Sequence, residues 1–199
     1  MKYYDISREM LSAPRYPDAP GPYLEQLASF SEGYPYNLNL LHSNLHAGTH
    51  CDAYLHFCDG AKDISEMPLD HFIGPCQVLS IPENCLVQAE FFKDNLAKSV
   101  KRLLLKSNGT SYLAPCAGQY LIDQGIITVG ADAWSVAPME DEASIHVPFL
   151  SNGVAIIESL DLSEAADGNY FLVAAPVKIK GAEGSPCRAI LFEKPLTLE

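Results

Sequence analysis

The chain has little positive charge. Its 199 residues include 13 Lys and Arg against 25 Asp and Glu, which gives a formal net charge of −12. Binding to nucleic acid needs a cationic surface that neutralises phosphates, so we expect no nucleic-acid partner. The same charge discourages anionic substrates at long range, although a bound divalent cation would reverse the sign locally.

Long apolar runs are also missing. No segment approaches the roughly 18 to 20 uninterrupted apolar residues of a membrane-spanning helix. The first residues, MKYYDISREM, hold scattered charges instead of the apolar core of a signal peptide. The apolar fraction of 48% and the charged fraction of 19% are ordinary for a globular protein. We therefore expect a cytoplasmic protein with no membrane partner.

Several chemical motifs are absent. The sequence has no GxSxG elbow, no HExxH and no glycine-rich phosphate loop followed by lysine. Its cysteines form no CxxC pair, which disfavours a zinc ribbon. With no sign of secretion, we expect them to be reduced and mostly buried. They are Cys51, Cys58, Cys76, Cys85, Cys116 and Cys187.

The apolar pattern predicts a mixture of strands and helices. Five prolines from Pro14 to Pro35 disfavour regular helix there and leave a loop that could wrap a surface or reach a neighbouring subunit. Residues 89–106 are ambiguous, because the first part has helical spacing and 102–106 could be a buried strand. A helix is expected at 118–124. Strands are expected at 4–7, 36–40, 76–81, 126–132 and 153–160, with two more in 169–193.

These expected elements define the fold class. Strands outnumber helices, and no linker, repeat or low-complexity tract divides the chain. A chain of 199 residues is long enough to bury one good core. We therefore expect one α/β or α+β domain that spans residues 1–199.

One short stretch concentrates side chains that bind metals. HAGTHCDAYLH at 46–56 contains His46, His50, Asp52 and His56, and imidazole with carboxylate suits zinc and related divalent ions. In a straight strand, His46 and His50 would lie about 13 Å apart, too far for one ion. On a helix the aspartate would point away from the histidines. A metal site therefore requires a bend between the histidines, which Gly48 makes most readily.

His56 lies beyond the three close-spaced residues and could have another role. A histidine with a pKa near neutral, placed beside a metal site, could act first as general base and then as general acid. Any one of these histidines could instead serve as a hydrogen-bonding loop residue; the group as a whole favours a metal. Cys51 is disfavoured as a nucleophile, because an extended backbone turns it to the opposite face.

Two further residues could contribute. His146 and Glu158 lie twelve positions apart, each in or next to a predicted strand. Taken alone they are weak candidates, since His146 could be a loop histidine and Glu158 a strand-end carboxylate. Glu158 directly follows the apolar residues VAII, so it needs a partner if it is buried. A cation would be a suitable partner.

The stretch from His46 to Phe57 resembles the HxGTHxDxPxHF signature of the cyclase-like metal-dependent hydrolases, a family that includes bacterial kynurenine formamidase and isatin hydrolase. Similarity to this family extends along the chain. It includes YDIS at 4–7, RYPDAP at 15–20, PLDHFIGP at 68–75, VGADAWSV at 129–136 and GSPCRAILFE at 184–193.

The resemblance implies roles for the matching residues. His46, His50 and Asp52 would be metal ligands, His146 and Glu158 would complete the metal centre, and His56 would be the general acid/base. One or two zinc ions, or manganese, would bind. The resemblance further implies a single β-rich α/β domain of the swivelling β/β/α type. It also implies a homodimer whose N-terminal segments help to close the partner's pocket.

The predicted function is hydrolysis of an amide-type C–N bond in a small aryl formamide or cyclic amide. Alternatives are a lyase or dehydratase that uses the same metal, a lactone hydrolase, and a metal-binding dimer without activity. The signature proline is Tyr54 here, so we expect substrate shape to differ, with a phenol that enters or flanks the site. Tyr16, Phe57 and Phe72 are candidate apolar walls, though each could equally be a core residue.

Overall fold

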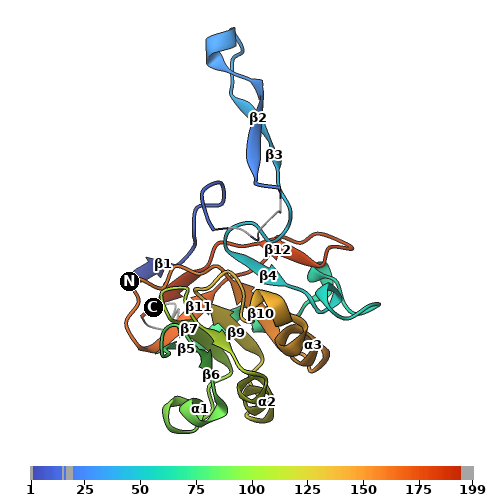
Figure 1. Ribbon diagram of the computed structural model, residues 1–199. Helices are drawn as coiled ribbons and strands as arrows, with labels where there is room; N and C mark the ends of the chain where they lie inside the picture. Colours follow the sequence, from blue (N-terminus) through green and yellow to red (C-terminus); the bar gives the residue numbers. More distant parts are fainter. Residues whose placement is uncertain (1, 15, 17–19, 194–199) are drawn as a thin grey trace.

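A nine-stranded sheet lies at the centre of the computed structural model (Figure 1), which describes residues 2–14, 16 and 20–193. The strand order is β1-β13-β11-β5-β7-β9-β10-β4-β12. Neighbours from β5 through β7 and β9 to β10 are parallel, and the other pairs are antiparallel. The strands are β1 (Tyr3–Asp5), β4 (His50–Asp52), β5 (Ile73–Ser80), β7 (Arg102–Lys106), β9 (Thr128–Ala131), β10 (Ala155–Glu158), β11 (Gly168–Val173), β12 (Gly184–Pro186) and β13 (Ile190–Phe192).

Three helices join the parallel strands in turn. α1 (Ala89–Asn95) lies between β5 and β7, α2 (Pro115–Asp123) between β7 and β9, and α3 (Ala143–Ser151) between β9 and β10. α2 contacts both other helices. Short elements complete the description: β6 (Leu86–Val87) paired with β8 (Tyr112–Leu113), and the 3₁₀ turns η1 (Phe30–Glu32), η2 (Tyr54–His56), η3 (Ile64–Glu66), η4 (Leu69–His71) and η5 (Met139–Asp141).

The sheet is buried on both faces. Alternate residues of β7 show this, because Leu103 packs in the core cluster shared with the helices and Leu104 packs in the cluster on the other face. Strands buried on both faces read as continuous apolar runs, which is why β9 and β10 were recognisable in the sequence. The prediction of a mixed α/β fold is confirmed.

Two predicted elements were wrong. The C-terminal segment forms three strands instead of two. β12 forms one edge of the sheet beside β4, whereas β13 lies near the other edge beside β1. The acid-rich loop expected before β10 contains α3. Residues 89–106, which were ambiguous, form both α1 and β7.

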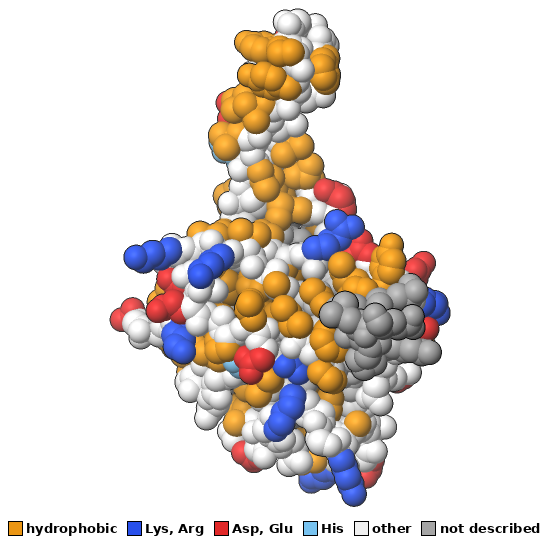
Figure 2. All heavy atoms as spheres, turned by 180° about the vertical axis from the view of Figure 1, so that it is seen from behind, with side chains coloured by type: hydrophobic (Ala, Val, Ile, Leu, Met, Phe, Trp, Pro, Cys, Tyr) orange, Lys and Arg blue, Asp and Glu red, His pale blue; other side chains and the backbone are white. Residues whose placement is uncertain are grey.

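A two-stranded arm projects from the body (Figure 1). β2 (Tyr23–Ala28) pairs with β3 (Leu38–His42), and this hairpin occupies most of the segment predicted as a proline-rich loop; most of the RYPDAP stretch lies outside the described residues. Apolar side chains follow the arm from its foot to its tip (Figure 2). Those at least 47% exposed are Tyr23, Leu24, Leu27, Phe30, Tyr34, Tyr36, Leu38, Leu40 and Leu41.

The helices are short. Within residues 2–14, 16 and 20–193, none has the length and apolar character needed to cross a membrane.

The apolar–polar alternation at 36–40 predicted a strand, and a strand, β3, is present there. However, β3 lies in the arm, and most of its residues are exposed. The apolar–polar alternation of this strand therefore does not correspond to one buried face and one solvent-exposed face.

Candidate metal centre and substrate cavity

β4 holds two of the candidate ligands. It lies between β10 and β12, where strand alternation places His50 and Asp52 on one face and Cys51 on the other. Gly48 has a φ of +65°, a left-handed conformation that glycine adopts readily. This turn brings the rings of His46 and His50 to a centroid distance of 4.9 Å. The bend predicted at Gly48 is confirmed.

α3 and β10 supply the other two candidates. Glu158 ends β10, as predicted, but His146 lies on α3 and not on a loop or strand. A helix was unexpected because Pro148 falls inside it, and proline usually disrupts a helix interior. The buried pair Ile145 and Phe149, four positions apart, was the helical signal that the sequence reasoning missed.

The five candidate ligands form two groups that share Asp52. Within each group the ligand atoms lie within 4.8 Å of one another. Asp52 Oδ1 is 3.1 Å from His46 Nδ1 and 3.5 Å from His50 Nε2, and Asp52 Oδ2 is 3.7 Å from His146 Nε2. The two oxygens of Glu158 lie 3.3 Å from His50 Nε2 and 3.3 Å from His146 Nε2. The carboxylate of Asp52 thus lies between the groups.

Buried atoms without partners fit a divalent cation here. Both oxygens of Asp52, with Nε2 of His46 and of His50, are buried and accept or donate no hydrogen bond among the described residues. Nδ1 of His50 and of His146 lies 2.8 and 2.9 Å from a backbone carbonyl oxygen, which can only accept. Each Nδ1 therefore carries a proton, so once the imidazole is neutral its Nε2 presents a lone pair to the centre. Such unpaired buried atoms are costly unless an ion satisfies them.

Charge is concentrated at this centre. Burial disfavours the charged imidazoles, but the adjacent carboxylates outweigh it and raise the pKa of His46 and of His146 to about 9. Burial likewise disfavours the charged form of Glu158, but the neighbouring histidines outweigh it and hold its pKa well below the usual range. Protons on His46 and His146 thus supply positive charge beside the buried carboxylates.

His56 lies beside the two groups without belonging to either. It ends η2, and its ring stacks on that of His46 with a centroid distance of 4.3 Å and an interplanar angle of 28°. The ring of His146 is 6.0 Å away. Burial lowers the pKa of His56, and the two neighbouring histidines lower it further against the opposing effect of the carboxylates. The lowered pKa favours the neutral form of the His56 imidazole.

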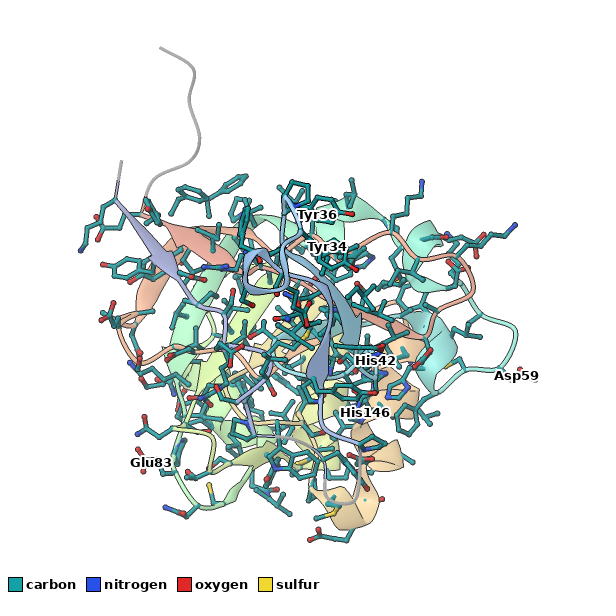
Figure 3. All side chains as sticks on the ribbon, turned by 90° about the horizontal axis from the view of Figure 1, so that it is seen from above. Tyr34, Tyr36, His42, Asp59, Glu83 and His146 are labelled. Atoms are coloured by element: carbon teal, nitrogen blue, oxygen red, sulfur yellow. The ribbon has the colours of Figure 1, made fainter. Side chains whose placement is uncertain are left out.

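A cavity of about 250 Å³ opens over these groups. Its aromatic wall includes Tyr16 and Trp134, whose rings meet edge to face at 5.4 Å, and Phe57, which stacks on His146 at 4.6 Å. Figure 3 shows His146 toward the middle of the view, with Asp59 and Glu83 at the periphery. The lining residues are Pro14, Tyr16, Asn44, His46, His50, His56, Phe57, Trp134, Glu142, His146, Glu158 and Ser159.

The sequence matches a model of a known protein family. The family model described as "Putative cyclase" matches residues 4–138. The chain belongs to this family. The cyclase family was expected from the signature at 46–57, and that expectation is confirmed.

Curated relatives of this cyclase-family chain are named kynurenine formamidases. The protein of Delftia acidovorans (strain DSM 14801 / SPH-1) is 30% identical over 202 residues, which cover 96% of this chain and 97% of the relative. That of Paracidovorax citrulli (strain AAC00-1) is 33% identical over 187 residues, which cover 85% and 87%.

Solved structures share the fold along nearly the whole chain. A potential metal-dependent hydrolase with cyclase activity superposes with a TM-score of 0.85 at 27% identity, covering 98% of this chain and 99% of its own. An isatin hydrolase bound to the product analogue thioisatinate superposes with a TM-score of 0.84 at 18% identity, covering 97% and 93%. The latter likeness is evidence for the fold alone.

For two residues of this cyclase-family protein the structure decides between the alternatives that the sequence left open. Phe72 is fully buried in the core and forms no part of the described lining. Tyr54 does not line the cavity either, because its hydroxyl lies 2.9 Å from His71 Nε2 and 3.1 Å from the carbonyl oxygen of Gly153. The residue at the position of the signature proline therefore joins three segments of the body.

The cysteines divide by environment. Cys51 is fully buried, with its thiol 3.4 Å from the carbonyl oxygen of Ala174, which agrees with its low ranking as a nucleophile. Cys76 is also buried, but the expectation of mostly buried cysteines was wrong for Cys85 and Cys116, which are exposed. Cys58 and Cys187 are partly buried.

Several cavity residues were not predicted from the sequence. Asn44, Glu142 and Ser159 are polar lining residues whose motif context gave no signal. Trp134 could have been found, since it is the only tryptophan in the chain and follows a strong strand prediction. Glu183 was also missed; its carboxylate lies 3.4 Å from His46 Nε2.

Proposed function

We propose that this chain is a cytoplasmic, metal-dependent hydrolase that cleaves the amide C–N bond of a small aryl formamide or cyclic amide. One observation carries the proposal: two ligand groups share the buried carboxylate of Asp52, and His56, which stacks on His46, lines the same cavity as the other four ligands. The name of its curated relatives, kynurenine formamidase, supports the bond class. A cavity of about 250 Å³ suits a small substrate.

The metal ligands in this proposal are His46, His50 and Asp52, with His146 and Glu158 completing the centre. Nitrogen and oxygen donors of this kind favour zinc, and manganese is an alternative. Because Asp52 belongs to both groups, the centre has room in its ligand set for one ion or two. A bound divalent cation would supply two effects, a lowered pKa of water and a polarised substrate carbonyl.

His56 does the proton chemistry. Its lowered pKa favours the neutral imidazole, which accepts the proton of the attacking water. It then donates that proton to the leaving nitrogen, so that a neutral amine departs. Its stacking on His46 holds the ring next to the metal ligands throughout.

Metal analysis combined with a substrate panel tests the proposal. Purified protein is expected to hold one or two equivalents of zinc by mass spectrometry and to hydrolyse formanilide or isatin. Asp52→Asn is expected to lose metal and activity together. Asp59→Asn makes the same chemical change on an exposed loop and is expected to retain both. A metal-replete protein that turns over no amide or lactam would overturn the proposal.

The role of His56 has its own test. His56→Ala is expected to retain the metal content of the wild type and to lose turnover by about two to four orders of magnitude, the usual range for general acid–base catalysis. Full turnover in this variant would exclude the assigned role. Loss of metal would instead show that His56 is a ligand.

We also propose a homodimer in which the arm packs on a second copy of the chain. An isolated two-stranded hairpin is marginal in water, and this one exposes apolar side chains along its length. The segments at its foot supply Tyr16 and Asn44 to the cavity, so a partner on the arm would lie near the active site. Light scattering should give a dimer for wild type and a monomer for Leu41→Glu. Leu86→Glu, equally exposed at 47% but on the body, should remain dimeric.

A further inference from the structure

The backbone fixes the orientation of two of the three proposed histidine ligands. Nδ1 of His50 and of His146 faces a backbone carbonyl oxygen. The ring of His46 faces carboxylates at both of its nitrogens instead. Its Nδ1 lies 3.1 Å from Asp52 Oδ1, and its Nε2 lies 3.4 Å from Glu183 Oε1. The surroundings of this ring therefore decide which nitrogen is turned toward the metal centre.

The Nε2 edge of the His46 ring packs against β12. A Cβ atom on Gly184 would lie 2.8 Å from Cε1 and 3.1 Å from Nε2 of this ring, so only glycine lets the strand approach so closely. Nε2 itself is buried, and among the described residues no hydrogen bond reaches it. This edge leaves no room for an ion. The edge that faces the shared carboxylate of Asp52 carries Nδ1.

This arrangement determines where the imidazole proton lies. A neutral imidazole has one N–H and one lone pair, so a lone pair at Nδ1 of His46 leaves the proton on Nε2. A buried N–H without an acceptor is costly. Glu183 is the carboxylate that approaches this nitrogen from β12, outside both ligand groups. The histidine ligand of a metal commonly donates its other N–H to such a carboxylate.

The backbone around Glu183 is anchored, whereas its side chain can move. The N–H of Ala53 donates to the carbonyl oxygen of Glu183, and Gly184 is paired with Asp52 across the two strands. The chain therefore holds Glu183 beside the same strand that carries the ligands. Its side chain is 42% exposed, so it can turn to align with the Nε2 proton without disturbing the core.

We infer that Glu183 is a positioning residue, which accepts the Nε2 proton of His46 and thereby directs the Nδ1 lone pair toward the metal centre. This inference rests on the proposed metal-dependent function and adds a residue that lies outside its ligand set. The ring of His56 stacks on that of His46, so the same contact also steadies the proposed general base. Loss of a carboxylate in this role typically lowers metal affinity by about 10–100-fold.

The affinity is measured without catalysis, by competition for zinc between the protein and a chelator of known affinity. Glu183→Ala is expected to raise the zinc dissociation constant by about 10–100-fold. Glu183→Gln keeps an acceptor oxygen but loses the charge, so it should give a smaller increase. Glu142→Gln is the matched control, because it removes the same charge from a cavity residue that belongs to neither ligand group. This control is expected to change the constant least.

The position of the proton provides the second readout. Nitrogen-15 NMR of histidine-labelled, zinc-loaded wild type should show His46 protonated at Nε2, opposite to His50 and His146. A His46 ring protonated at Nδ1 would overturn the inference. So would a Glu183→Ala variant with the zinc affinity of wild type, or one no weaker than Glu142→Gln, since the effect would then be one of general charge. Wild-type protein that takes up no zinc would instead contradict the proposed function itself.

Discussion

Removal of the Tyr54 hydroxyl should destabilise the protein more than its partly exposed position suggests. The hydroxyl lies within hydrogen-bond distance of His71 Nε2 and of the Gly153 carbonyl oxygen. His71 is only 7% exposed, and its Nδ1 lies 2.8 Å from the carbonyl oxygen of Ile127, so its Nε2 is left to accept from the phenol. Tyr54→Phe therefore leaves a buried acceptor without its donor.

The magnitude follows from that unpaired acceptor. An unsatisfied buried polar group costs about 1–3 kcal/mol, and partial access of water to this tyrosine places the expectation near 1–2 kcal/mol. For a chain of this length, each kcal/mol lowers Tm by about 2–4 °C, so a fall of roughly 2–8 °C is expected. Because Tyr54 begins the turn that carries His56, turnover should also decrease.

Urea unfolding of wild type and Tyr54→Phe, followed by circular dichroism, measures the difference directly. Tyr170→Phe is the matched control, since its hydroxyl donates to one surface carbonyl, that of Ala166. The control is expected to change the free energy of unfolding by less than about 0.5 kcal/mol. A Tyr54→Phe variant as stable as this control would refute the reasoning.

Three other predictions concern the centre and the core. Gly48→Ala should weaken zinc affinity and lower the free energy of unfolding by about 1–3 kcal/mol. The φ of +65° disfavours alanine, and the alanine Cβ would lie 3.0 Å from Met10 Cα. Calorimetric zinc titration measures the affinity, and urea unfolding measures the stability. In metal-free protein the pKa of His46 and of His146, about 9, exceeds the usual 6.5. Their contribution to the free energy of unfolding is thus complete below pH 6.5 and is lost as pH rises through 9. Zinc affinity should instead increase over this range, because the protons leave the two histidines. Urea unfolding and zinc titration at several pH values check these two opposite trends. Phe72→Ala should cost about 3–5 kcal/mol in a urea melt yet leave the substrate preference unchanged, because the side chain is in the core.

The sequence predicted the parts of this protein that follow from periodicity and local backbone geometry. β9 and β10 were visible as apolar runs, and the bend at Gly48 followed from the reach of two histidines around one ion. Positions fixed by tertiary packing could not be read in this way. β12 pairs with β4, more than a hundred residues earlier, and only that register places Gly184 against His46. α3 continues through Pro148 because its buried face packs on the core.

The direction of a side chain was equally hidden from the sequence. Tyr54 sits within the signature and was expected to enter or flank the site, and its phenol points to His71 and Gly153. Glu142 belongs to no recognisable motif, and only the turn into α3 brings it to the cavity. Residue type identified the metal-binding chemistry, whereas the three-dimensional packing determined which additional groups share the cavity.

The placement of β4 between β10 and β12 has a consequence for biosynthesis. The strand that carries His50 and Asp52 is made early, but both of its neighbours come from the last quarter of the chain. β1 likewise can pair only after β13 has been synthesised. Pairings so distant in sequence form slowly and late. The proposed ligand set can therefore be complete only after nearly the whole polypeptide has left the ribosome, and until then the early strand is an unpaired edge.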